Sequence, residues 1–279
     1  MSEDAARKDI EKAQIVPAER PRRVWRYRHA LPVRLTHWIT AGAILILLMS
    51  GLQIFNAHPA LYWGDVTDFD NPVFTIDPMT GTNRLLGAEW GNGLTPYDTA
   101  LPSWMTLPAY RSLPDGRLWH FFFAWVLVGS LALYLAWGLV SRHLQRDIVP
   151  RGRDFRNLPA SAWQHMRLKF HDAAGRYSSV QKISYAAVLF VVLPLIILTG
   201  LTMSPAMNAA WPFLVDLFGG RQSARTIHFI CAIALALFAI VHVVMALLSG
   251  PINALVGIVT GWRRERIETE DQEERGDER

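Results

Sequence analysis

Apolar side chains gather in four long stretches of the chain. Asp, Glu, Lys and Arg are absent from residues 35–64, 118–141, 183–215 and 226–262. A helix rises about 1.5 Å per residue, so about 20 apolar residues cross a hydrocarbon core of about 30 Å. The pattern predicts four membrane-spanning helices, over residues 35–55, 118–140, 183–203 and 226–248. The first stretch follows 34 residues and lacks a small-residue cleavage site, which is unlike a signal peptide.

The distribution of positive charge predicts how these helices cross the membrane. Lys and Arg number nine in residues 1–34, nine in 141–182 and five after Trp262, against five in 56–117 and 204–225 together. Cytoplasmic segments carry the excess of Lys and Arg in membrane proteins. We therefore expect an all-α, four-transmembrane-helix bundle in the bacterial cytoplasmic (inner) membrane. Both termini would be cytoplasmic and residues 56–117 periplasmic. A nucleic-acid-binding arm is a less favoured explanation of the basic N-terminal segment.

The polar segments complete the predicted organisation. We divide the chain into a polar cytoplasmic segment (1–24), a four-helix domain (25–262) and a charged cytoplasmic tail (263–279). Short interfacial helices are expected at residues 160–171 and 252–262. The loop over residues 56–117 is rich in Pro, Gly, Asn and Trp and contains seven acidic residues. Because so long a loop is usually functional, we interpret it as a docking surface for a periplasmic partner. A lid without a partner is the alternative.

Four histidines lie in the predicted spans at two depths. His37 begins the first span on the cytoplasmic side, and His120 begins the second on the periplasmic side. In the fourth span His228 is periplasmic, and His242 lies about 21 Å deeper on nearly the same helix face. An ionisable ring in an apolar span is costly and is usually functional. Depth therefore pairs His120 with His228 and His37 with His242.

These two pairs indicate axial ligands for two b-type haems. Two imidazoles fill both axial positions of a haem iron, which favours electron transfer over oxygen binding. Zinc is the alternative metal, but it usually takes four ligands around one ion. The single Cys231 excludes an internal disulfide and a CxxCH haem attachment. The remaining histidines are expected in loops or at interfaces: His29, His58, His143, His165 and His171, of which His143 is the reserve ligand for the inner haem.

Arginines near the two depths are candidate partners for haem propionates. They are Arg34, Arg117, Arg176 and Arg225. A topology or headgroup charge is the alternative role for each. Near the inner haem, Arg176, Tyr177 and Gln181 are candidate quinone contacts, since a quinone site combines an apolar slot with a few polar groups.

Several segments resemble a known group of bacterial membrane proteins. These are RHALPVRLTHW, SGLQIFNAHPALYWG, GRLWHFFFAW, QKISY, PLIILTGLTMSP and GGRQSARTIHF followed by VHVVM. Over about residues 24–262 the chain resembles the di-haem cytochrome b membrane subunits, a superfamily of b561-type cytochromes and the b subunits of nickel–iron hydrogenases and formate dehydrogenases. The longer segments look most like the thiosulfate reductase cytochrome b branch. The resemblance implies the same four ligands, His37, His120, His228 and His242.

The resemblance also implies a function. The chain would transfer electrons between the quinone pool and a periplasmic oxidoreductase, often of the molybdopterin type, through its two haems. It contains no molybdopterin or iron–sulfur motif, so that chemistry would belong to another subunit. One alternative is an autonomous superoxide:quinone or ferric oxidoreductase, and a second is a non-redox membrane anchor or transporter. A homodimer is compatible with the sequence, which does not determine the oligomeric state.

Overall fold

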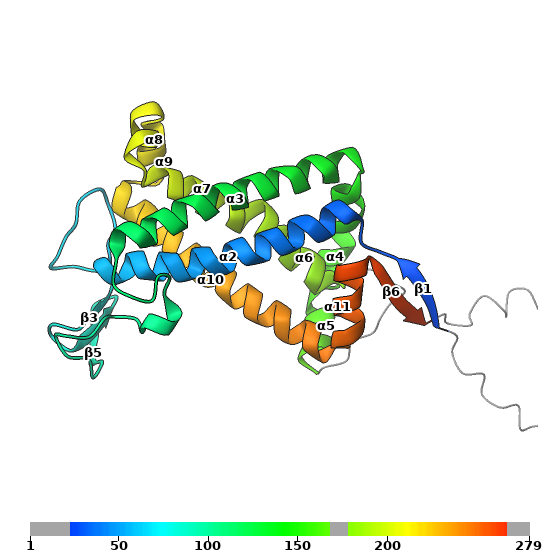
Figure 1. Ribbon diagram of the computed structural model, residues 1–279, viewed down its shortest axis with the longest axis horizontal. Helices are drawn as coiled ribbons and strands as arrows, with labels where there is room; N and C mark the ends of the chain where they lie inside the picture. The colour runs from blue at the N-terminus through cyan, green and yellow to red at the C-terminus, as the bar shows by residue number, and fades with distance from the viewer. Residues whose placement is uncertain (1–22, 168–177, 267–279) are drawn as a thin grey trace, which may run out of the picture.

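The computed structural model describes residues 23–167 and 178–266, which form a mostly helical bundle (Figure 1). Within these residues four helical segments are long and apolar enough to cross a membrane. Three are single helices, α2 (Leu31–Ala57), α3 (Leu113–Val140) and α10 (Arg221–Leu248). The other combines α6 (Ser179–Ala187), η3 (Val188–Val192) and α7 (Leu193–Thr202). The prediction of four helices with the length and composition of membrane spans is confirmed.

Each long helix begins a few residues before the predicted span, because its first turn is polar or contains proline. Pro32 lies in the first turn of α2, where the missing N–H costs no hydrogen bond. The Ser112 hydroxyl caps α3 by accepting from the Asp115 N–H, and Ser178 caps α6 in the same way from Gln181. The π-helical turn η3 precedes Pro194, whose ring nitrogen cannot donate to the preceding turn.

The long helices pack in two pairs. α2 lies along α3, and α7 lies along α10. In the middle of the bundle each of these four helices contributes one buried side chain to an apolar cluster, formed by Ala43, Leu127, Leu193 and Leu235. This cluster is the core of the membrane-spanning part. Outside this cluster, few residues of α2 contact residues of α10 within the described chain.

Residues 58–112 build one end of the molecule, here called the sheet end (left in Figure 1). They form an antiparallel sheet in the order β2 (Ala60–Leu61), β3 (Phe74–Asp77), β4 (Thr82–Leu85) and β5 (Ala88–Gly91), followed by the short helix η1 (Ser103–Met105). Helices α8 (Pro205–Ala210) and α9 (Phe213–Leu217) lie at the same end. The sequence predicted an irregular loop here, and the strands were missed. The turn between β4 and β5 has positive φ at Leu86 and Gly87, and leucine is not a usual signal for such a turn.

The opposite end, here called the ribbon end, joins the two ends of the described chain. β1 (Arg23–Tyr27) pairs antiparallel with β6 (Trp262–Arg266) beside α11 (Pro251–Thr260). The turn η2 (Leu144–Ile148) and helices α4 (Gly152–Arg156) and α5 (Leu158–Met166) lie at this end too. Helices α5 and α11 occupy most of the two predicted interfacial segments, and residues 168–171 of the first lie outside the described residues.

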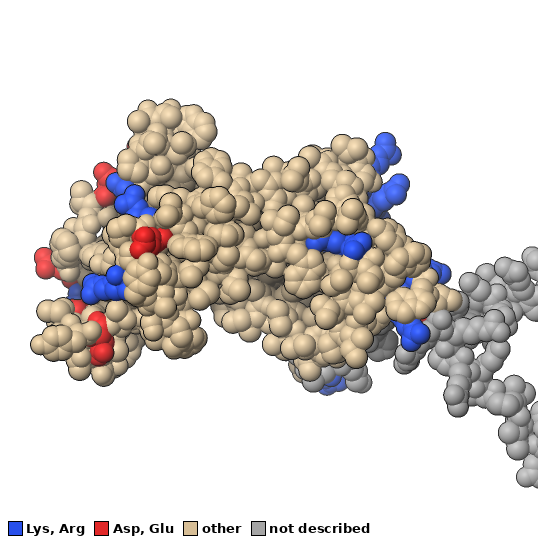
Figure 2. All heavy atoms as spheres, in the orientation of Figure 1, with Lys and Arg blue, Asp and Glu red and all other residues tan. Residues whose placement is uncertain are grey.

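Charged side chains are divided between the two ends. On the face shown in Figure 2, Asp and Glu side chains are visible at the sheet end, and a belt without charge follows. At the ribbon end the charged side chains in view are almost all Lys or Arg. An uncharged belt between two charged ends is the surface that a membrane-spanning bundle requires.

Candidate functional site

Two pairs of imidazole rings face each other inside the bundle. At the sheet end, His120 on α3 and His228 on α10 have ring centres 6.1 Å apart. At the ribbon end, His37 on α2 and His242 on α10 have ring centres 6.3 Å apart. The structure thus brings together the same residues that their predicted depths grouped. All four rings are partly buried, and the apolar cluster of the bundle centre lies between the two pairs along the helices.

The spacing within each pair fits one metal ion held from two sides. An imidazole nitrogen lies about 1.1 Å from its ring centre and about 2 Å from a bound metal, so two opposed ligands have centres about 6 Å apart. Neither pair has a third donor: no group of three or more His, Cys, Asp or Glu that could hold a metal occurs among the described residues. A porphyrin supplies four nitrogen ligands of its own, so a haem iron would need from the protein only the two imidazoles that each pair offers.

Hydrogen bonds determine which nitrogens of the sheet-end pair can bind a metal. His228 Nδ1 lies 2.9 Å from the Ile196 carbonyl oxygen and 3.2 Å from Thr199 Oγ1. A carbonyl only accepts, so Nδ1 carries the proton and donates. The Ser50 hydroxyl donates to the Ile46 carbonyl at 2.7 Å and so accepts from His120 Nδ1 at 3.1 Å, and the His120 ring is also hydrogen-bonded to the Leu47 backbone. Both Nε2 atoms therefore keep their lone pairs, as metal ligation needs, with the ring oriented through its other nitrogen.

The supports for His120 and His228 follow the same pattern on two different helices. On α2 they are a carbonyl at Leu47, a hydroxyl at Ser50 and a glycine at Gly51; on α7 they are Ile196, Thr199 and Gly200. A Cβ on either glycine would lie 3.3 Å from Cε1 of the supported ring, so both rings lie against bare backbone. Sequence reasoning missed these supports, although the repeated Ser/Thr-Gly-Leu sequence at 50–52 and 199–201 was a usable signal.

The ribbon-end pair has aromatic neighbours instead. Trp38 meets the His37 ring edge-on at 5.3 Å, and Phe238 stacks on His242 at 5.9 Å. Tyr185 approaches His242 edge-on at 6.0 Å. Two buried polar atoms here have no hydrogen-bond partner among the described residues, His37 Nδ1 and Arg34 Nε. A buried donor left unpaired is costly, and a bound anionic group such as a propionate would satisfy the Arg34 guanidinium.

An arginine precedes three of the four histidines by one helical turn. The sequences are RLTH at 34–37, RLWH at 117–120 and RTIH at 225–228. Each of these helices begins at the end of the bundle nearest its histidine, so each arginine lies one turn closer to the surface than the imidazole. Arg225 Nη2 donates to the His58 carbonyl at 2.6 Å, and Arg34 Nη2 donates to the Val259 carbonyl. Arg117 is exposed and lies over the Phe121 ring.

Of the three candidate quinone contacts, the structure describes only Gln181. Arg176 and Tyr177 lie outside the described residues. Gln181 Oε1 accepts from the Ser178 N–H at 3.1 Å and completes the cap of α6. That hydrogen bond already engages the amide oxygen of Gln181.

The other histidines whose side chains the structure describes, His29, His58 and His143, do not join either pair. His143 Nδ1 is 2.7 Å from Asp147 Oδ2, four residues along the chain. Burial, followed by the nearby Arg263 charge, holds the pKa of His29 below its ordinary value. Burial, followed by Arg225, lowers the pKa of His58 as well. His171 and the side chain of His165 lie outside the described part of the structure.

A small cavity lies beside the sheet-end arginines. It has a volume of about 260 Å³ and is lined by Met203, Arg221, Gln222 and Arg225. Two guanidinium groups make it a favourable site for an anion. Arg225 lies one turn from His228, so a carboxylate of a group bound by the sheet-end pair could reach this arginine.

Two comparisons relate the chain to known proteins. A family model described as prokaryotic cytochrome b561 matches residues 28–261, which include all four histidines of the two pairs. The chain is also similar to a protein of Azospira oryzae named putative protein-methionine-sulfoxide reductase subunit YedZ1. The two are 27% identical over 217 residues, which cover 77% of this chain and 88% of that protein.

Proposed function

We propose a function on one premise: the chain belongs to the prokaryotic cytochrome b561 family. It is accordingly a multi-pass membrane protein, a b-type cytochrome that binds haem and transfers electrons. Our proposal goes further, to two haems b, a quinone and a periplasmic oxidoreductase. The observation that carries it is the pair of opposed imidazoles at each end of the bundle, with ring centres 6.1 Å and 6.3 Å apart.

The side chains of the two sites would divide the task of holding haem. His120 and His228 would bind one iron, and His37 and His242 the other. Arg225 and Arg34 would pair with propionates, and Arg117 would contribute at the sheet end if its side chain turned inward. When bound, haem would supply a one-electron couple at iron, and two imidazoles from the protein would suit electron transfer rather than oxygen binding. The two histidines on α10 are 14 positions apart, so they lie about 21 Å apart along the helix.

The orientation we propose places the ribbon end in the cytoplasm of a bacterium and the sheet end in the periplasm. The support is the asymmetry of Lys and Arg along the sequence, together with the Asp and Glu side chains that gather at the sheet end in Figure 2. In this orientation His37 and His242 form the inner site in the cytoplasmic membrane. His120 and His228 form the outer site, facing the partner.

A quinone would react near the inner site. The aromatic side chains of Trp38, Tyr185 and Phe238 lie next to His37 or His242 and would give the apolar surroundings that a quinone ring needs. Arg176, Tyr177 and Gln181 remain candidate contacts, with Gln181 the weakest because its side chain caps α6.

The sheet end would dock a periplasmic oxidoreductase, which we propose to be of the molybdopterin type. The related protein from Azospira oryzae is named as a subunit of a reductase, which supports a partner of this kind. Large apolar side chains are strongly exposed at this end, such as Val66, Phe69, Leu86 and Trp104, each at 74% or more. Exposed apolar and aromatic groups are typical of interfaces. Five of the seven acidic residues of the loop, by contrast, accept hydrogen bonds from neighbours in the same loop or the start of α3: Asp68, Asp77, Glu89, Asp98 and Asp115.

Reconstitution tests the proposed function. Membranes that contain the chain are supplied with a quinol analogue, with and without an added periplasmic molybdopterin-type oxidoreductase in its oxidised form. Haem that is reduced by the quinol and reoxidised only when the oxidoreductase is present supports the proposal, as does the reverse transfer from the reduced oxidoreductase through haem to quinone. Rapid quinone reduction by superoxide without any partner would favour an autonomous enzyme. A preparation without haem, despite adequate haem supply, would favour an anchor or transporter.

A further inference from the structure

The inner imidazoles come from two helices that hardly touch at that end. His37 lies on α2 and His242 on α10, yet α2 packs along α3, and α10 along α7. Figure 1 shows α2 and α10 running apart toward the ribbon end. Direct contact between these helices occurs near the sheet end, where Phe55 and Phe229 have ring centres 4.8 Å apart. Direct packing between α2 and α10 therefore contributes little to the separation of His37 and His242.

The β1–β6 ribbon connects these two helices through the chain itself. β1 leads directly into α2, and β6 follows α10 through α11. The strands are antiparallel, with Tyr27 opposite Trp262 and Trp25 opposite Arg264. Beyond the strands, the N–H groups of Arg28 and His29 both donate to the Gly261 carbonyl, at 2.7 Å and 3.3 Å. Arg34, in the first turn of α2, donates to the Val259 carbonyl of α11.

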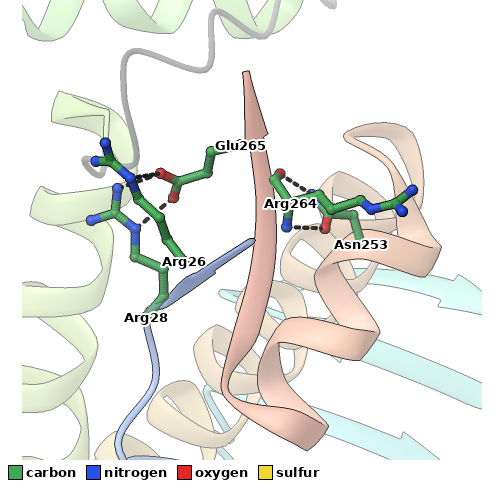
Figure 3. Close-up of polar contacts among 5 residues, drawn as sticks. All are labelled: Arg26, Arg28, Asn253, Arg264 and Glu265. Carbon is green, nitrogen blue, oxygen red and sulfur yellow. Dashed lines mark hydrogen bonds and ion pairs between the residues drawn. The ribbon is translucent and has the colours of Figure 1, made fainter. Parts of the chain in front are cut away.

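An ion pair between Arg28 and Glu265 connects the two chain segments on one face of the ribbon. Arg28 donates from Nε and Nη2 to the two carboxylate oxygens of Glu265, at 2.5 Å and 2.6 Å, and Arg26 lies 3.9 Å away (Figure 3). The hydrogen bonds from Arg28 hold the pKa of Glu265 below its usual value, so this carboxylate is charged at neutral pH. Bidentate arginine–carboxylate pairs fix geometry as well as adding attraction.

The free edge of β6 is tied to α11. Asn253 accepts from the Arg264 N–H and donates to the Arg264 carbonyl, both at 2.9 Å (Figure 3). Gly261, between α11 and β6, has φ +89°, and a Cβ there would lie 2.5 Å from Tyr27 Cε2 and 2.8 Å from the His29 carbonyl oxygen. Only glycine allows this close crossing of the two ends of the domain.

We propose that the β1–β6 ribbon is a positioning device for the inner haem, and that Arg28, Glu265 and Gly261 set the separation of His37 and His242. This inference rests on the two-haem assignment of the proposed function. The outer site needs no such device, because His120 and His228 are hydrogen-bonded to α2 and α7 within the bundle. Weakening the ribbon therefore disturbs one haem and leaves the other unchanged.

Low-temperature EPR of the full-length, haem-loaded protein tests this, because the signal of a bis-imidazole ferric haem depends on how its two ligands are held. Two variants loosen the ribbon by different means, Glu265→Lys by charge reversal and Gly261→Ala by steric conflict. Arg156→Ala on α4 is the control, because this exposed residue lies at the same end of the molecule but outside the ribbon. We expect the inner signal to shift or broaden and inner haem to dissociate about tenfold faster, the low end for changes in residues that support a ligand.

The outcomes separate the ribbon inference from the two-haem assignment. The inference is supported if both variants change the inner signal alone and if Arg28→Glu combined with Glu265→Arg restores it. It fails if two wild-type signals persist unchanged in both variants, or if both signals change equally. A wild-type protein with a single haem signal would overturn the two-haem assignment itself, and the ribbon inference with it.

Discussion

A single methyl group at Gly200 or Gly51 should disturb the outer haem and spare the inner one. In each case the added Cβ would lie 3.3 Å from Cε1 of an imidazole, His228 for Gly200 and His120 for Gly51. Ordinary van der Waals contact of such carbons needs about 3.5–4.0 Å. The ring would therefore have to move by a few tenths of an ångström.

The ring has little freedom to make that movement. On one side, His228 Nδ1 is held 2.9 Å from the Ile196 carbonyl, and on the other its Nε2 would bind iron. Overpacking a well-filled site costs about 1–3 kcal/mol, and about 1.4 kcal/mol is tenfold in an equilibrium constant. We expect outer-haem affinity to fall about tenfold in Gly200→Ala and by a similar factor in Gly51→Ala.

Haem titration of the apoprotein measures this affinity, with EPR assigning each signal to its site. Gly129→Ala on α3 is the matched control, because a Cβ there meets nothing within 4 Å. The reasoning about the outer site is refuted if Gly200→Ala and Gly51→Ala bind both haems as tightly as Gly129→Ala does. It is also refuted if the inner haem is the one that weakens.

Three further predictions concern the same architecture. His228→Ala should remove the outer haem spectrum and keep the inner one, and His242→Ala should do the reverse; full occupancy of both sites in either variant would show that the pairing is wrong. Thr199→Val removes a hydroxyl that lies 3.2 Å from His228 Nδ1. In a redox titration the midpoint potential of the outer haem should change and that of the inner haem should not; equal changes in both would contradict the hydrogen-bond assignment. Leu86→Glu places a charge on a strongly exposed apolar residue of the sheet end. It should leave haem content unchanged but reduce electron transfer with the partner about tenfold or more, as for loss of an interface hot spot. Unchanged electron transfer with the partner would exclude Leu86 from the docking surface.

The membrane-spanning part of this fold was predictable because it depends on local properties of the sequence. A run of about 20 apolar residues can be recognised without knowing its neighbours. Depth within the membrane is also a local property once topology is assigned, so His37 could be matched with His242, and His120 with His228. The structure brings the same residues together, at ring-centre distances of 6.3 Å and 6.1 Å.

The parts that sequence analysis missed depend on contacts between distant or atypical segments. β1 and β6 pair across more than 230 residues, and neither strand has a distinctive alternation of apolar and polar residues. The Leu86–Gly87 turn has a leucine at positive φ. Because leucine is not a usual turn residue, the sequence did not predict the β4–β5 hairpin. Gln181 was a candidate quinone contact because it is polar near a predicted span. Its role as a helix cap became visible only with the Ser178 N–H beside it.

The haem content of the purified protein tests the central claim most directly. A pyridine haemochrome assay, with protein quantified by amino-acid analysis, gives the number of haems b per chain, and a redox titration separates them by potential. The account predicts two haems b per chain, with a bis-imidazole EPR signal for each. One haem per chain, or a signal from iron with an open axial position, would contradict it.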